Sequence, residues 1–119
     1  MHALAAAIAA AAMIAAAPTY AAALDFERVY RGTLVSTYPD GRQARIWLDR
    51  NGEYRAANRR GKPSSGHWKI ARSRVCFLQA RPFPAPFSFC TPLPARVDRP
   101  WTGKAATGEP VTITLVDGR

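Results

Sequence analysis

Hydrophobic and polar residues alternate along several short segments of this chain, which is the pattern of β-strands with one buried face. In "QARIWLD", Ala44, Ile46 and Leu48 fall on one face, and the residues between them fall on the other. In "VTITLV", residues 111–116, the same alternation sets aliphatic side chains opposite two threonines. In "GHWKIA", residues 66–71, it places the tryptophan and the isoleucine together, away from the histidine and the lysine. Each segment therefore predicts a strand that turns one face toward a core.

Turn residues separate these segments at short intervals, as in an antiparallel β-protein with hairpin connections. Examples are "YPDGR" at 38–42, "DRNGE" at 49–53 and "ATGEP" at 106–110. We expect strands near residues 29–37, 43–49, 53–57, 67–72, 74–79, 87–91, 97–104 and 110–116. No segment after residue 23 has the i, i+3, i+4, i+7 apolar spacing of a long helix. The prediction is an all-β fold, a single small antiparallel meander of about six to eight strands, barrel-like or folded as a two-layer sandwich.

The N-terminus differs from the rest of the chain and has the composition of a secretory signal peptide. Residues 3–17 are apolar without a break, Pro18 ends the run, and "AAA" at 21–23 supplies small residues for a cleavage site. The run falls short of the roughly 20 apolar residues that span a bilayer. We therefore expect residues 1–23 to be removed and residues 24–119 to form one β-rich domain, periplasmic or secreted. An uncleaved anchor is the alternative, because no Lys or Arg precedes the run.

Cys76 and Cys90, the only cysteines, bracket the stretch "CFLQARPFPAPFSFC". Two cysteines in a small exported domain are interpreted first as a disulfide, which would contribute about 3 kcal/mol for a loop of this length. A redox pair normally has the spacing C-x-x-C. A structural zinc site needs about four ligands, and besides scattered carboxylates only His67 remains after residue 23. We therefore predict a Cys76–Cys90 disulfide, with no metal and no cofactor.

The chain is strongly basic, with 17 Lys and Arg against 8 Asp and Glu and a net charge of +9. Its steepest local bias supplies the candidates for an anion-binding surface: Arg55, Arg59, Arg60, Lys62, Lys69, Arg72 and Arg74. Export makes an anionic lipid or polymer of the cell envelope, or a protein partner, a better candidate than nucleic acid. The alternative is that the charge only keeps the protein in solution.

Prolines and phenylalanines crowd the segment between the cysteines. The prolines at positions 82, 84 and 86 block regular strand pairing and favour extended backbone. We expect Phe83, Phe87 and Phe89 to fold back over an open end of the barrel as a plug, because exposed apolar patches are uncommon on monomers. The alternative is an exposed binding loop that the disulfide pre-organises.

Nothing in the sequence indicates catalysis. A general base is most often a histidine, and strand alternation places His67 opposite Trp68, on the outer side of its strand. Asp40, Asp49 and Asp117 sit in turns, where Asp usually hydrogen-bonds its own backbone. We therefore expect no catalytic residue and no enzyme activity.

The order of several motifs resembles small exported bacterial β-proteins of uncharacterised function. These motifs are "GHW" at 66–68, the strand "RVCFLQ", the turn "CTPLP", Trp101 with Thr102, and the closing "VTITLVDGR". More distantly, the signal, the size and the single disulfide are similar to periplasmic metalloprotease inhibitors of the lipocalin-like superfamily. That superfamily carries its G-x-W motif near the first strand, whereas here it lies mid-chain, and "LDFERVYRG" matches no inhibitory motif. No functional residue is carried over.

These observations together predict a non-enzymatic exported β-domain that binds a component of the cell envelope, with an anionic surface as the first candidate. The alternative is a lipocalin-like inhibitor or small-ligand carrier that uses the barrel mouth or the loop at 82–89. A carrier requires an apolar cavity inside the barrel.

Overall fold

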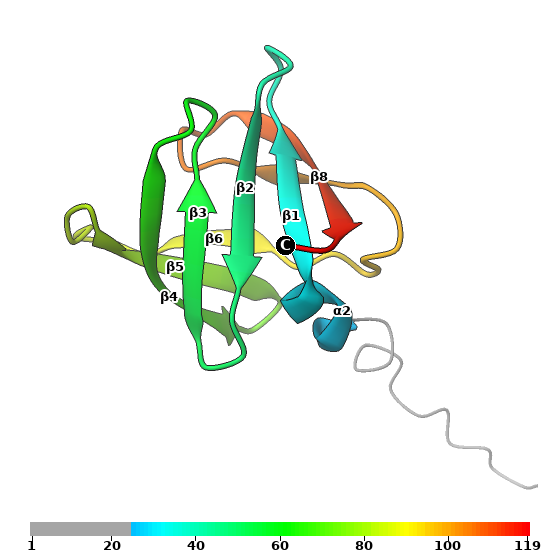
Figure 1. The fold of residues 1–119 in the computed structure, drawn as a ribbon, viewed down its shortest axis with the longest axis horizontal. Coiled ribbons are helices and arrows are strands. Elements are labelled where there is room, and N and C mark those ends of the chain that lie inside the picture. The colour runs from blue at the N-terminus through cyan, green and yellow to red at the C-terminus, as the bar shows by residue number, and fades with distance from the viewer. Residues whose placement is uncertain (1–24) are drawn as a thin grey trace, which may run out of the picture.

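In the computed structural model, which describes residues 25–119, eight antiparallel strands form one sheet (Figure 1). They are β1 (Gly32–Thr37), β2 (Gln43–Leu48), β3 (Glu53–Ala57), β4 (Pro63–Ala71), β5 (Arg74–Arg81), β6 (Phe89–Pro92), β7 (Trp101–Lys104) and β8 (Pro110–Asp117). Their order across the sheet is β6-β5-β4-β3-β2-β1-β8-β7. The sheet curls into a nearly closed barrel, which confirms the predicted all-β fold.

The alternation in the sequence becomes an inner and an outer face of the barrel. Ala44 and Leu48 of β2 are buried, and Ile46 between them packs against the core. Every second residue of β8 from Val111 to position 115 is likewise buried. The register of β1 and β2 places Leu34 opposite Ile46, so their side chains share the inner face.

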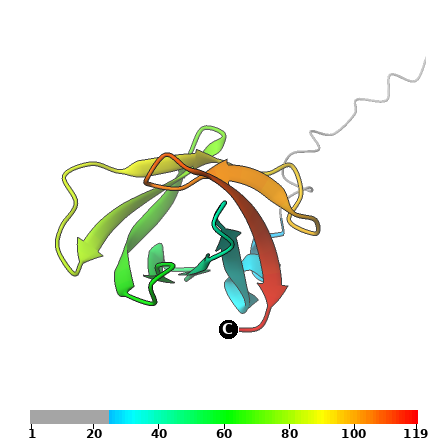
Figure 2. The ribbon, with the colours of Figure 1, turned by 90° about the horizontal axis from the view of Figure 1, so that it is seen from above.

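Consecutive strands are neighbours around the whole barrel, so the chain runs up and down. The strands β6 and β7 form the two edges of the sheet, and the view from above shows these edges approaching each other (Figure 2). Gly103 permits the approach, because a Cβ atom there would lie 2.8 Å from Ile113 Cδ1 and 3.2 Å from Thr91 Oγ1. Within residues 25–119 the buried Thr91 hydroxyl has no hydrogen-bond partner. The seam between β6 and β7 is therefore an incomplete closure.

A short helix, α2 (Phe26–Arg31), precedes β1, so the prediction of a strand from residue 29 is wrong for its first three positions. Asp25 caps this helix, because its side chain accepts a hydrogen bond from the Arg28 N–H at 3.1 Å. Glu27 in the first turn also favours the helix, since it complements the positive end of the helix dipole.

The helix is held in place by aromatic packing. Phe26 and Tyr30 lie one turn apart, and their ring centroids are 6.3 and 6.1 Å from that of Trp68. The Trp68 indole N–H donates to the Asp49 carbonyl oxygen at 2.9 Å. Val29, on the same helix, is buried in the core. Tertiary packing thus stabilises a helix that is too short to be stable alone.

Two other strands begin four residues away from their predicted starts, and the remaining boundaries differ by no more than two residues. The strand β4 begins at Pro63 rather than at residue 67, and β7 begins at Trp101 rather than at residue 97. Val97 is nevertheless buried in the core, so its apolar character reflects packing of an irregular segment rather than a strand. The predicted signal peptide, residues 1–23, lies outside the described residues.

The up-and-down order gives the barrel two ends of different construction. The helix end is formed by α2 and by the connections at 49–52, 72–73 and 93–100. The turn end is formed by the hairpin turns at 38–42, 58–62 and 105–109 and by the longer loop at 82–88.

Candidate functional site

The barrel encloses a cavity of about 400 Å³. All eight strands contribute residues to its lining, and most of these side chains are apolar, among them Leu34, Ile46, Phe77 and Ile113. A barrel of about eight strands is just wide enough to be filled by side chains or to hold one small ligand. Here the side chains leave about 400 Å³ unfilled, so the interior has room for a small ligand.

At the helix end the cavity is bounded mainly by core packing, although the exposed Ile70 and Pro92 also border it. Val29, Leu48, Val97 and Leu115 form a buried cluster there together with Tyr54. The Tyr54 ring packs edge-on against an aromatic ring of β5, and burial raises the pKa of its phenol. Its hydroxyl therefore stays protonated at neutral pH and adds no charge to the apolar interior.

At the turn end the cavity reaches the surface. Several exposed residues at this end line the cavity, and Asn58, Phe87 and Ala106 among them belong to three different connections. Phe87 is 82% exposed although it also borders the cavity. A ligand can therefore reach the interior from this end.

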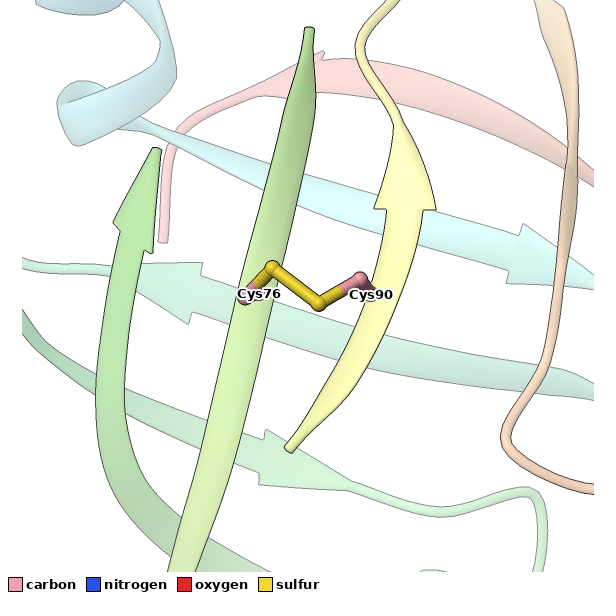
Figure 3. Close-up of a disulfide and its surroundings, with 2 residues drawn as sticks. All are labelled: Cys76 and Cys90. Atoms are coloured by element: carbon pink, nitrogen blue, oxygen red, sulfur yellow. A yellow bond between two sulfur atoms is a disulfide. The ribbon is translucent and has the colours of Figure 1, made fainter. Parts of the chain in front are cut away.

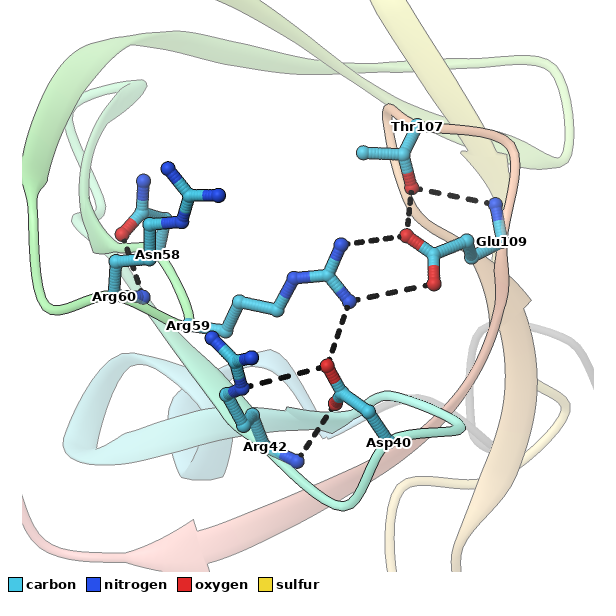
Figure 4. Close-up of polar contacts among 7 residues, drawn as sticks. All are labelled: Asp40, Arg42, Asn58, Arg59, Arg60, Thr107 and Glu109. Carbon is cyan, nitrogen blue, oxygen red and sulfur yellow. Dashed lines mark hydrogen bonds and ion pairs between the residues drawn. The ribbon is translucent and has the colours of Figure 1, made fainter.

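A cluster of charged residues joins three hairpin turns at the turn end (Figure 4). Arg59 Nη2 donates to Glu109 Oε1 at 2.7 Å, and Arg59 Nη1 donates to Asp40 Oδ2 at 3.3 Å. The same guanidinium lies over the Tyr38 ring, 4.2 Å from its centroid. The Thr107 hydroxyl donates to the Glu109 carboxylate at 2.9 Å. The cluster ties together the three turns beside the cavity opening.

The charges in this cluster support one another. The hydrogen bond from Arg59 is the main cause that lowers the pKa of Glu109 below its ordinary value, and the bond from Thr107 is the second. The hydrogen bond to Glu109 in turn raises the pKa of Arg59. Arg59 is therefore engaged within the protein, which weakens its candidacy as an anion-binding residue.

The six other anion-binding candidates are exposed and form no ion pair within residues 25–119; they are Arg55, Arg60, Lys62, Lys69, Arg72 and Arg74. They do not gather into one patch. Arg60 and Lys62 lie in the β3–β4 turn at the turn end, whereas Arg72 and Arg74 lie at the helix end. The strand β4 separates these pairs by about 30 Å, at roughly 3.3 Å per residue. The remaining two lie between them, so the set forms a stripe along the β3–β5 side.

The structure places the three candidate phenylalanines in two environments. Phe89 is half-buried and pairs with Phe77 across β5 and β6, whereas Phe83 and Phe87 are 65% and 82% exposed. The predicted plug is therefore wrong for these two residues. The physical reason is local: the Gln79 side chain donates to the Phe83 carbonyl oxygen at 3.0 Å and helps to hold the loop in its own conformation.

The disulfide between Cys76 and Cys90 is confirmed (Figure 3). The two residues face each other directly in the register of β5 and β6, with their Cα atoms 4.0 Å apart. The bond ties the edge strand β6 to β5 at the base of the 82–88 loop. A disulfide in an all-β domain is consistent with an extracellular or periplasmic location.

Other kinds of site find no support among the described residues. His67 is exposed on β4, and no group of three or more His, Cys, Asp or Glu side chains in residues 25–119 is arranged to hold a metal ion. None of the helices in this part of the chain is long and apolar enough to cross a membrane.

Comparisons of the chain with protein-family models, with curated proteins and with solved structures found no match. The function is therefore argued from the geometry of the site.

Sequence reasoning missed Asp40 and Glu109 as partners of Arg59. The sequence did indicate that these turns lie close together, because alternate hairpin turns of an up-and-down barrel fall at the same end. The turns that carry Asp40, Arg59 and Glu109 are of this kind. The cavity itself had no signal in the sequence beyond the small size of inward-facing residues such as Ala44 and Ala56.

Proposed function

We propose that the protein is a non-enzymatic binding protein that holds one small apolar or amphiphilic molecule inside its barrel. The observation that supports this proposal is the apolar cavity of about 400 Å³ that reaches the surface at the turn end. Small-molecule sites typically have volumes of about 300–1,000 Å³ and a largely apolar lining with a few polar groups. Ser36 and Gln79 are such polar groups in this lining.

The test is a titration with N-phenyl-1-naphthylamine, an uncharged fluorophore that brightens in apolar surroundings. We expect saturable binding of one probe per chain. Ala44 is buried on the inner face of β2 and lines the cavity, so Ala44→Phe places a ring in the ligand's space. This variant should bind the probe at least about tenfold more weakly, which corresponds to about 1.4 kcal/mol.

The matched control is Gln43→Phe, which adds the same ring to an exposed neighbouring position of β2. It should bind the probe as the unmodified protein does. If a folded Ala44→Phe variant also keeps full affinity, the probe binds outside the barrel and the proposal fails.

A second candidate function is the binding of an anionic component of the cell envelope. It is favoured by the net charge of +9 and by the six exposed basic residues that have no ion-pair partner within residues 25–119. Such binding attracts the partner at long range and weakens with salt, because counterions screen exposed charges.

The probe for this candidate is dextran sulfate, a soluble polyanion. The double variant Arg60→Glu with Lys62→Glu should bind it several-fold more weakly, and salt should weaken both proteins. Arg31→Glu with Arg99→Glu is the matched control, since these exposed residues have no ion pair in the described part of the chain. Equal affinities of the two double variants would show that the net charge matters and the stripe does not.

A further inference from the structure

The loop between β5 and β6, residues 82–88, is the most apolar exposed segment of the described chain. It projects from the barrel in both views (Figures 1 and 2). Phe83 is 65% exposed and Phe87 is 82% exposed, whereas the other large exposed hydrophobic residues are less than half exposed: Ile70, Leu78 and Val116. Two aromatic side chains exposed to water on one short loop do not contribute to the core, and such exposure is typical of an interaction site. We name residues 82–88 the Phe loop.

The Phe loop is held in its projecting conformation from its base. Gln79 makes two of the contacts: its side chain donates to the Phe83 carbonyl oxygen at 3.0 Å, and its own carbonyl oxygen accepts from the Ala85 N–H at 2.9 Å. The disulfide between Cys76 and Cys90 joins the two strands that carry the loop. The exposed rings are therefore pre-organised, so less conformational entropy is lost when they bind a partner.

The backbone of the Phe loop is suited to an apolar environment. Leaving water is costly for a free backbone N–H. Pro82, Pro84 and Pro86 have no backbone N–H, and the N–H of Ala85 donates to the Gln79 carbonyl oxygen of β5. Few donors would have to lose their water if the tip entered the interfacial region of a lipid bilayer.

Basic residues flank the Phe loop, and the acidic residues nearest to them in the turns, Asp40 and Glu109, are paired with Arg59. Arg81 is exposed at its base and pairs with Ser65, near the start of β4. The β3–β4 turn just beyond that start carries the exposed Arg60 and Lys62. No Asp or Glu occurs anywhere in residues 54–97. This side of the protein therefore complements a negatively charged surface.

We propose that the Phe loop docks the protein on an anionic phospholipid bilayer, with Phe83 and Phe87 at the boundary between head groups and acyl chains. Arg60, Lys62 and Arg81 would face the lipid phosphates. Binding at such an interface combines buried apolar area with attraction to anionic head groups. The inference rests on the second candidate function, and it selects a bilayer over a soluble polyanion. Because Phe87 also borders the cavity, docking places the cavity opening beside the membrane.

The experiment measures cosedimentation of the purified protein with vesicles of phosphatidylglycerol and phosphatidylcholine in equal parts. Vesicles of phosphatidylcholine alone and soluble dextran sulfate are measured in parallel. We expect the double variant Phe83→Ser with Phe87→Ser to lose at least about tenfold in binding to the anionic vesicles and to keep its affinity for dextran sulfate. The control is Val116→Ser, which removes an exposed hydrophobic side chain from β8 and should leave vesicle binding unchanged.

The other outcomes separate the two proposals. Binding to dextran sulfate without binding to anionic vesicles would overturn docking and leave the anionic-surface candidate standing, whereas binding to neither would overturn both. If the double variant binds anionic vesicles as well as the unmodified protein does, charge alone suffices and the Phe loop has no part. Self-association that disappears in the double variant, measured by light scattering, would show that a second copy covers the loop and would also overturn docking.

Discussion

The two ends of the barrel are closed by different interactions. At the helix end, Phe26 stacks against Trp68 and Tyr30 packs against it at a tilt, with a buried hydrophobic cluster behind them. An ion pair between Glu27 and Arg50 adds to this packing. At the turn end, the connections are joined by the ion pairs of Arg59 with Asp40 and Glu109. A smaller buried cluster of Ala105, Val111 and Ile113 lies beside them.

Because of this difference, one end contributes most to the stability of the fold, and the other admits a ligand to the cavity. Buried apolar area stabilises the folded state strongly, whereas ion pairs that remain partly open to solvent, like those of Arg59, contribute less and respond to salt and pH. The helix end therefore contributes more than the turn end to the free energy of unfolding. The turn end, where the cavity reaches the surface, has the smaller buried cluster, so we expect its ion pairs to break before the barrel unfolds.

The largest expected effect is at the helix end. Trp68→Ala removes the ring that holds α2 and leaves a cavity, so we expect the free energy of unfolding to fall by about 3 kcal/mol. Urea denaturation followed by circular dichroism measures this loss.

The control for this prediction is Trp47→Ala. Trp47 is also half-buried and its indole N–H donates to Thr33 Oγ1 at 2.9 Å, but it belongs to the outer face of β2. The variant Trp47→Ala should lower the free energy of unfolding clearly less than Trp68→Ala does. A larger loss of unfolding free energy for Trp47→Ala would mean that the helix end does not contribute most to the stability of the fold.

The disulfide lies between the two ends and supports the hairpin that carries the Phe loop. Cys76→Ala and Cys90→Ala should each lower the free energy of unfolding by about 3 kcal/mol. The double variant should be no less stable than either single variant, because the same disulfide is lost in all three proteins. Denaturation without reductant measures these values. Strongly unequal losses would show that one cysteine contributes by packing rather than by the bond.

The strands were predictable because their local signal agrees with their tertiary environment. The period of two in β2 and β8 places apolar residues on the inner face in the structure as in the sequence. The helix α2 was missed because its apolar positions span a single turn. Its stability comes from Trp68, about forty residues away along the chain, and such packing leaves no local signal.

The candidate site was predictable only in part. The disulfide followed from counting cysteines, since Cys76 and Cys90 had no other partner of their kind. The exposure of Phe83 and Phe87 depended on how one loop folds back on Gln79. The distribution of the basic residues depended on the length of β4, which proved longer than its apolar pattern indicates. These are properties of three-dimensional spacing, and composition does not encode them.

A gain in stability is expected at the β4–β5 turn of the helix end. Arg72 has a backbone φ of 56°, a left-handed conformation that costs a residue with a Cβ atom roughly 1–2 kcal/mol. Arg72→Gly should therefore raise the free energy of unfolding by about 1 kcal/mol, after the entropy cost of glycine in the unfolded chain is included. Thermal denaturation measures the gain.

The neighbouring variant Ser73→Gly is the control, because Ser73 is not in a positive-φ conformation. It should be neutral or slightly destabilising. Equal gains from both variants would indicate that loop flexibility, rather than relief at Arg72, is responsible.

The smallest expected effect on stability is at the turn end, and it depends on pH. The Arg59 hydrogen bond lowers the pKa of Glu109 below its ordinary value of 4.5. A carboxyl with a lowered folded-state pKa stabilises the fold fully above its unfolded-state pKa, and this contribution is lost as pH falls through the lowered value. The melting temperature of Glu109→Gln should therefore lie slightly below that of the unmodified protein at neutral pH, and the difference should vanish in acid.

The control for this pH dependence is Asp98→Asn. Arg96 lowers the pKa of Asp98 in the same way, but this pair lies in the 93–100 connection at the helix end. Both variants should show the same convergence of melting temperatures in acid. Only Glu109→Gln should also release N-phenyl-1-naphthylamine faster in a stopped-flow dilution at neutral pH, because only Glu109 helps to join the turns beside the cavity opening. Equal release rates for the two variants would mean that the Arg59 cluster does not restrain access, and the contrast between the two ends would then be one of stability alone.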